Sequence, residues 1–372
     1  MNKIARNHGI DLLRILSMFG VILLHILNHG GVLHLTHSPA RFSTVWFLEA
    51  LSDPAVNCFM LISGYVGYRG EKAFPKIKNL LSLLFTVLFY SITIFFLFKL
   101  FGPDPLGMKA LIKSFLPTML NQYWFFTAYF GLFLISPVLN IFVHKSNLKQ
   151  AFVFLIVFFL FSIVSTVYDS FSILRGYSVL WFIFMYLVGA IIKKYDLSRL
   201  FSKKIWLLIV LSALAVTWLS KIVLYFTNIP FLQSHSSELV KYVSPTIVIM
   251  SIGLLCLFAK IRCPSSLCSV ISFVAPSAFS VYLIHDNVYI RMYLMSHMHK
   301  FADGFNAALI ALFIVCSAAA IFLVCIIIDK IRTGLFALIR IDKLAAHIED
   351  FLKANLNALY KKFQRKLEQP ES

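Results

Sequence analysis

An arginine and a histidine share one face of the first strongly apolar segment of the chain, at Arg14 and His25. Eleven residues bring a helix round to within roughly 20° of its start, with the two side chains ~16 Å apart along the axis. An ionisable group inside a membrane is costly and usually faces a cavity that belongs to a site. The alternative is a histidine that packs between helices and an arginine that extends to the headgroups.

This spacing suits a reaction on a long anionic substrate. A cation at the inner mouth of the segment, Arg14 beside Asp11, suits phosphate recognition. A neutral imidazole deeper in the membrane, at His25, suits general-base catalysis. An acyl-coenzyme A thioester has the matching shape, with an anionic head, a long uncharged arm and a reactive carbonyl at its far tip.

Further polar residues reach a similar depth if the N-terminus is cytoplasmic. Glu49 and Asp53 are four residues apart in the second apolar segment and so share a helix face. Tyr123 and Trp124 open the fourth segment, and His285 lies in the outer half of the ninth. Each has a structural alternative, such as the interfacial aromatic belt for Trp124. We expect a cavity open to the outer leaflet, with catalytic candidates His25, Asp53 and Glu49 and substrate-binding candidates Trp124, Tyr123 and His285.

The elements that position these groups are membrane helices. The 372 residues are 60% hydrophobic and include 38 Phe, while 13% are charged, against about a quarter in soluble domains. Apolar stretches of ~20 residues predict an all-α integral membrane protein of about ten spans and no separate soluble domain. The predicted spans are 10–30, 45–68, 79–101, 121–143, 150–169, 178–193, 204–226, 242–260, 269–295 and 304–329.

The loop charges predict the orientation. With the N-terminus inside, the inner segments hold 24 Lys and Arg and the outer loops hold 7, which the positive-inside rule favours. Both termini are then cytoplasmic. The net charge of +18 is explained by topology and by anionic lipid, so no nucleic-acid partner is needed.

We divide the chain into a transmembrane domain, 1–330, and a basic tail, 331–372. Apolar residues from Leu344 to Leu367 recur at three- to five-residue steps among lysines and arginines. This pattern predicts an amphipathic helix on the membrane surface. A coiled coil that binds a partner protein is the alternative, although fewer than four clean heptads are present.

Four motifs together resemble the membrane-bound acyltransferase 3 family, bacterial O-acetyltransferases that modify surface polysaccharides. They are Asp11-Leu12-Leu13-Arg14 through His25, the Phe59–Tyr65 run, Tyr123–Tyr129 with Leu134–Pro137, and Phe279–His285. The resemblance extends from the first predicted span to the ninth.

The resemblance implies transfer of acetyl, or another short acyl group, from cytoplasmic acyl-CoA to a hydroxyl of an exported or lipid-linked glycan, in a bacterial cytoplasmic membrane. His25 would be the base or an acyl carrier. The coenzyme phosphates would be held by Arg14, Asp11, Lys76 and Lys78. We expect acetyl-CoA as donor substrate, no tightly bound cofactor and no metal.

Two positions depart from the family pattern. Many members have an Asp where this chain has Asn57, so either Asp53, one turn earlier, substitutes for it or that support is absent. The basic cytoplasmic motif usually holds arginines, and here it holds Lys76 and Lys78. Lysine binds phosphate as a point charge without the fork of arginine.

A transporter or flippase for a polar solute or lipid-linked sugar is the rival function, since it too needs a polar cavity. Against it, the sequence has no two repeated halves with matching Gly/Pro-broken spans. A purely structural membrane protein would not explain the cost of placing Arg14 and His25 on one stripe.

The topology can be tested by labelling. Cysteines introduced in 30–43 and 296–303 should react with an impermeant thiol reagent applied from outside, and cysteines in 70–78 and 196–203 should not, because positive loops stay cytoplasmic. The reverse labelling pattern would contradict the orientation.

Overall fold

The computed structural model describes residues 6–35, 38–70, 77–167, 169 and 171–368. It is 82% helical, and its described residues contain no strand. Within them, nine helical segments are long and apolar enough to cross a membrane: His8–Asn28, Pro39–Gly67, Ile77–Phe101, Trp124–Lys145, Leu148–Ser165, Lys203–Tyr225, Pro230–Ala259, Ser265–His285 and Ala307–Leu338. The predicted sixth span corresponds to α8 (Val179–Tyr195), which is apolar but has 17 residues, fewer than the ~20 of a typical span. The all-α integral membrane protein is confirmed.

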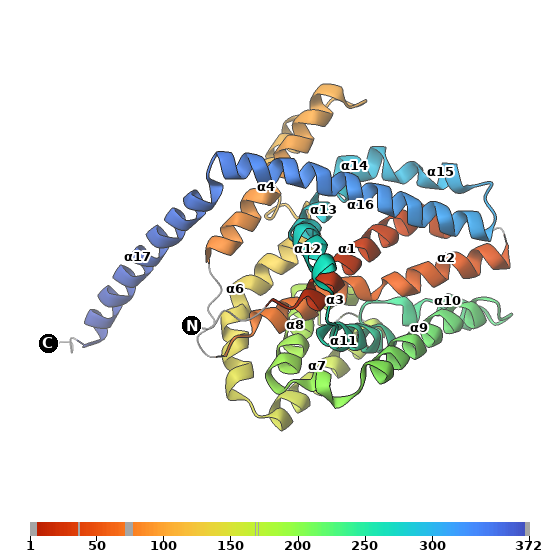
Figure 1. Cartoon of the computed structure of the whole chain (residues 1–372), viewed down its shortest axis with the longest axis horizontal. Helices are drawn as coiled ribbons and strands as arrows, with labels where there is room; N and C mark the ends of the chain where they lie inside the picture. The colour runs from red at the N-terminus through yellow and green to blue at the C-terminus, as the bar shows by residue number, and fades with distance from the viewer. Residues whose placement is uncertain (1–5, 36–37, 71–76, 168, 170, 369–372) are drawn as a thin grey trace.

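Helix α1 (His8–Asn28) occupies the interior of the bundle (Figure 1). Asn7 caps it by accepting hydrogen bonds from the amides of Gly9 and Ile10. The helices packed around it include α2 (Pro39–Ser52), α3 (Pro54–Gly67), α11 (Pro245–Ala259), α13 (Ala278–His285) and α16 (Ala307–Leu338). Because protein surrounds α1 on several sides, the face of α1 that carries Arg14 and His25 lies against other helices rather than lipid alone.

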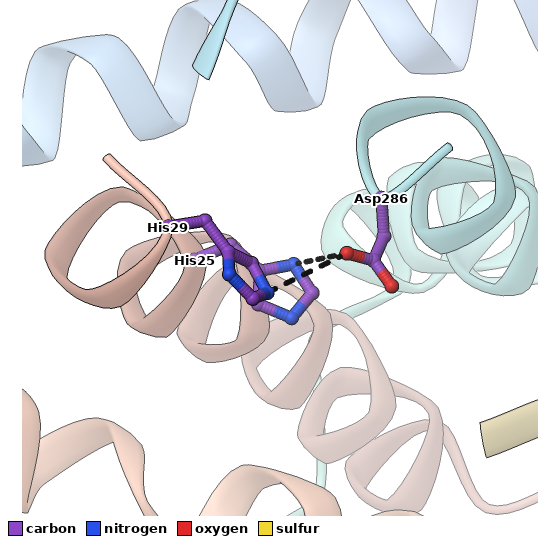
Figure 2. Close-up of side chains that lie close together, drawn as sticks. All are labelled: His25, His29 and Asp286. Carbon is purple, nitrogen blue, oxygen red and sulfur yellow. Dashed lines mark ion pairs between the residues drawn. The ribbon is translucent and has the colours of Figure 1, made fainter. Parts of the chain in front are cut away.

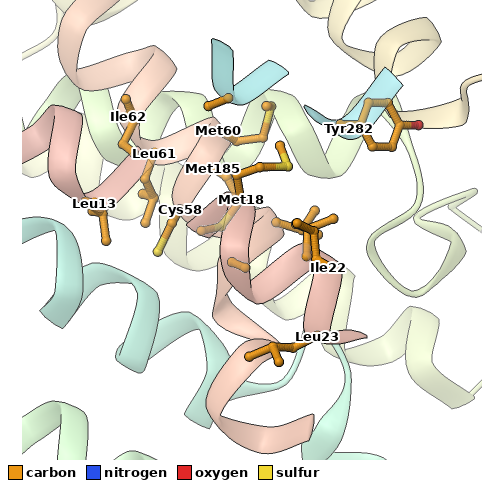
Figure 3. Packing of buried hydrophobic residues seen from close by; sticks show 14 of the residues in the cluster. Leu13, Met18, Ile22, Leu23, Cys58, Met60, Leu61, Ile62, Met185 and Tyr282 are labelled. Atoms are coloured by element: carbon orange, nitrogen blue, oxygen red, sulfur yellow. The ribbon is translucent and has the colours of Figure 1, made fainter. Parts of the chain in front are cut away.

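Helices α3 and α8 pack closely against each other, and α3 also packs against α1. A Cβ atom on Gly64 would collide with the carbonyl oxygen of Tyr186, and one on Gly189 would collide with that of Leu61. Only hydrogen at these two positions lets the backbones approach so closely. Figure 3 shows the resulting core, in which Leu61 of α3 and Met185 of α8 lie near α1.

Two of the spans are broken within the membrane. Pro54 has no amide hydrogen, and at Asp53–Pro54 the second span divides into α2 and α3. The ninth span was predicted as one helix over 269–295, which is wrong. It divides into α12 (Ser265–Val274), a turn over Ala275–Ser277, and α13, which ends at His285.

Asn287 explains why α13 ends early. Its side chain accepts a hydrogen bond from the amide of Tyr289 and so begins α14 (Val288–Tyr293). Its Nδ2 donates to the hydroxyl of Tyr123, 2.7 Å away. The side chain that caps the next helix therefore also fixes the turn to the start of α6 (Trp124–Lys145).

The remaining helices surround this core. They are α4 (Ile77–Phe101), α5 (Met108–Phe115), α7 (Leu148–Val167), α9 (Lys203–Tyr225), α10 (Pro230–Ser234) and α15 (Met298–Ala302). Helix α16 continues to Leu338, past the predicted end at 329, and α17 (Ile341–Glu368) follows after Arg340, whose φ is 59°. Helix α17 extends away from the bundle (Figure 1).

Candidate active site

His25 and His285 lie in contact where α1 and α13 end. His25 Nδ1 is 2.9 Å from His285 Nε2, and His285 Nδ1 is 2.6 Å from the carbonyl oxygen of Val281. A carbonyl oxygen can only accept, so His285 Nδ1 carries the proton. In the neutral ring Nε2 is then an acceptor, and His25 Nδ1 must donate to it.

This chain of hydrogen bonds leaves the lone pair of His25 on Nε2. Among the described residues, that nitrogen has no hydrogen-bond partner, and the side chain retains 14% of its exposure. A neutral imidazole with a free, accessible Nε2 can act as a general base or a nucleophile. His285, predicted as a substrate-binding residue, is placed by the structure against His25 itself.

A buried carboxylate accompanies the two histidines. Asp286 Oδ1 lies 3.6 Å from His25 Nδ1, 3.8 Å from His29 Nε2 and 3.3 Å from Arg291 Nη1. Figure 2 shows His25 and His29 on one face of α1, pointing toward Asp286. A negative charge at this distance would stabilise His25 if it became protonated. Neither Asp286 nor His29 was predicted from the sequence as a catalytic or binding residue, although the i,i+4 spacing of His25 and His29 was visible there.

Tyr123 supports this end of α13 instead of facing open space. It is 1% exposed, and its hydroxyl donates to the carbonyl of Leu283 at 3.1 Å while accepting from Asn287. The hydroxyl of Tyr123 therefore acts as both donor and acceptor within the protein. Tyr123, predicted from the sequence as a substrate-binding residue, is thus placed by the structure against the end of α13.

Glu49 and Asp53 lie on α2 beside the end of α1. Asn28 Nδ2 donates to Glu49 Oε1 at 2.8 Å, and Asn28 follows His25 by one turn. Glu49 Oε2 and Asp53 Oδ2 are buried without a hydrogen-bond partner. Across the described ranges, no hydrogen bond or ion pair joins either carboxylate to His25. The structure thus links Glu49 to the helix of the base and leaves two acceptor oxygens free.

Trp124 belongs to an aromatic cluster that leads toward these acids. Its ring centroid is 4.7 Å from that of Tyr177, which is 5.1 Å from Tyr242. The phenols of Tyr177 and Tyr242 are close enough to Asp53 and Glu49 to interact with their charges. Trp124 is half-buried within the bundle.

Asn57, which replaces the Asp of many family members, has a fully satisfied side chain. It is 0% exposed, accepts from Trp181 Nε1 at 2.9 Å, and donates from Nδ2 to the carbonyl of Tyr242 at 2.8 Å. A carboxylate could not donate the second bond. At this position the amide therefore joins α3 to α8 and to the segment before α11.

At the opposite end of α1, one carboxylate holds two arginines. Asp11 Oδ1 is 2.7 Å from Arg14 Nη1, and Asp11 Oδ2 is 2.5 Å from Arg6 Nε. Asp11 is buried, while 30% of the Arg14 side chain is exposed. Lys78 begins α4, and Lys76 lies outside the described residues.

Arg6 also lines a cavity of about 960 Å³ that sequence reasoning missed. The charged and titratable side chains around it are Arg6, His8, Lys193, Asp196, Arg199, Lys203, Lys260 and Arg262, with Tyr65 from α3. Asp196 pairs with Arg199, and Lys260 donates to the carbonyl of Phe201. All these charged residues come from segments that the loop charges assign to the cytoplasm, so the cavity is a basic pocket on that side. In the sequence these lysines and arginines cannot be distinguished from the positive charges that ordinarily mark the cytoplasmic loops of a membrane protein.

Comparison with known families gives an independent assignment. The acyltransferase 3 family model, described as an acyltransferase domain, matches residues 7–330. Neither curated proteins nor solved structures yield a match. The matched range includes α1, α2 and α13, which carry His25, Glu49 and His285. The chain is therefore a multi-pass membrane acyltransferase and belongs to the acyltransferase 3 family.

Proposed function

We propose that this protein transfers an acetyl or other short acyl group from acyl-CoA to a hydroxyl of a cell-surface or lipid-linked glycan, in the cytoplasmic membrane of a bacterium. The observation that carries the proposal is the free Nε2 of His25, oriented through its Nδ1 by His285. The family supplies acyl transfer in general. The donor, the acceptor and the membrane are our inference.

In the direct reaction, His25 Nε2 accepts the hydroxyl proton while the acceptor oxygen bonds to the thioester carbonyl carbon. The carbon–sulfur bond breaks, and the coenzyme A thiolate takes the proton from His25. Asp286, 3.6 Å from Nδ1, stabilises the transient imidazolium. In the alternative route Nε2 bonds to the acyl carbon as the carbon–sulfur bond breaks. The acceptor oxygen then bonds to that carbon as its bond to Nε2 breaks, and the hydroxyl proton goes to the coenzyme A thiolate, so both routes need the same lone pair.

The basic pocket is suited to the phosphates of the donor. Lys193, Lys203 and Arg262 line it, and within the described chain none of them is in an ion pair. Charge-assisted hydrogen bonds to phosphate are about twice as strong as neutral ones. The N-terminus of α1, which favours anions, opens at the same pocket through His8. The Arg6–Asp11–Arg14 ion pairs then continue along α1 toward His25.

The acceptor would approach from the other end of α1. Glu49 Oε2 and Asp53 Oδ2 are unpaired acceptors for sugar hydroxyls, and the half-buried ring of Trp124 offers an apolar face to a sugar. Membrane lipid is the remaining partner, which α17 would contact through its exposed apolar residues Leu344, Phe351, Leu356 and Leu359.

Acyl transfer can be measured by the release of coenzyme A. Membranes that contain the protein should release it from acetyl-CoA when a lipid-linked glycan precursor is supplied, and His25→Ala should lower the rate by at least about a hundredfold, because a general base contributes ~10²–10⁴. His235→Ala, at an exposed histidine, is the control for loss of an imidazole.

Two results would contradict the proposal. Glycan-dependent release at the parental rate by His25→Ala would remove the base from the mechanism. Movement of the glycan across the membrane, with acetyl-CoA left intact, would indicate a flippase.

The pocket gives a separate prediction. Lys193→Glu and Arg262→Glu should each raise the KM for acetyl-CoA roughly tenfold or more, since a hydrogen bond to a charged group contributes about 1.5–3 kcal/mol. The rate at saturating donor should change little. Lys149→Glu, at an exposed cytoplasmic-side residue away from the pocket, should leave KM unaltered. An unchanged KM in the two pocket variants would assign the phosphates to Arg14 and Lys78 instead.

A further inference from the structure

Two histidines and a carboxylate converge at the end of α1. His25 and His29 are one turn apart on the same helix, and Asp286 approaches from the end of α13 (Figure 2). One ligand atom from each residue, His25 Nδ1, His29 Nε2 and Asp286 Oδ1, lies within 4.8 Å of the other two. Two nitrogens and one carboxylate oxygen are a donor set that zinc commonly takes.

Two of the three ligand-atom separations are close to those around a bound zinc ion. Tetrahedral zinc bonds of ~2.0–2.2 Å require ligand atoms ~3.3–3.6 Å apart. The separations from Asp286 Oδ1 are 3.6 Å to His25 Nδ1 and 3.8 Å to His29 Nε2, and the two nitrogens lie within 4.8 Å of each other. Binding would draw these three atoms together and replace the proton that His25 Nδ1 shares with His285 Nε2, and a fourth position would stay open for water.

The cluster can also be reached. The His29 side chain is 38% exposed, whereas Asp286 is 3% exposed. Arg291, which neutralises Asp286 at 3.3 Å, is itself 35% exposed and can turn toward solvent when a cation replaces it. By the loop charges, this end of α1 faces the outside of the cell.

We propose that a zinc ion from the outer side binds His25 Nδ1, His29 Nε2 and Asp286 Oδ1 and thereby inhibits the enzyme. A zinc ion on Nδ1 takes the lone pair there, so a neutral His25 ring must carry its proton on Nε2. The nitrogen that would accept the hydroxyl proton is then occupied. The binding step stands on geometry alone, while the inhibition rests on the proposed function.

Zinc binding is measured first, without reference to activity. Purified protein in detergent is titrated with ZnCl₂ against a chromophoric zinc chelator. The parent and His235→Ala should each bind one equivalent of zinc. Their affinity should be at least about tenfold higher than that of His29→Ala, because even residues that only support the ligands contribute 10–100-fold to metal affinity. Asp286→Asn should also weaken binding. Equal affinity in the parent and His29→Ala overturns the site.

Inhibition is measured next, as coenzyme A release over a zinc titration. Parental activity should fall with added ZnCl₂ and return with EDTA. With inhibition expressed relative to each protein's own zinc-free rate, His29→Ala should require at least about tenfold more zinc than the parent for the same fractional inhibition. Zinc that binds the parent but leaves its rate unchanged overturns the inhibitory role. If neither protein releases coenzyme A, the proposed function fails while the binding result still decides the site.

Discussion

The hydrogen bond from His25 to His285 is the interaction on which the rest of the site depends. Because the Val281 carbonyl fixes the proton of His285 on Nδ1, the orientation of His25 is decided by the backbone of α13. That backbone is in turn held by Tyr123 and Asn287, which stop the helix at His285 and secure the following turn. The turn after His285 is therefore part of the geometry of the candidate site.

The two ends of α1 divide the chemistry. At one end, Asp11 holds Arg6 and Arg14 beside a basic pocket, where an anionic donor head would be stabilised. At the other end lie His25, the buried carboxylate of Asp286 and the buried, unpaired oxygens of Glu49 and Asp53. A single helix can keep these regions apart because its rise per residue is fixed. Its neighbour α3 is in turn packed closely against α8 through Gly64 and Gly189.

The sequence predicted the helices better than their interruptions. Long apolar runs reveal spans because every backbone group must be satisfied within the membrane, and the ends agree to within a few residues for most of them. The stripe of Arg14 and His25 followed from helical periodicity alone. The turn after His285 did not, because it depends on Asn287 meeting Tyr123 from a distant segment. The basic pocket was missed for a similar reason, since its lysines and arginines come from several separate segments that come together only in the fold. The role of Tyr123 also depended on burial that spacing could not reveal.

The state of His25 can be observed directly by ¹⁵N NMR of histidine-labelled protein, with its ring signals assigned by their loss in His25→Ala. At neutral pH the account predicts that His25 carries its proton on Nδ1 and none on Nε2, and that His285→Ala disturbs this state. A proton on Nε2 of His25 in the metal-free protein would contradict the base assignment.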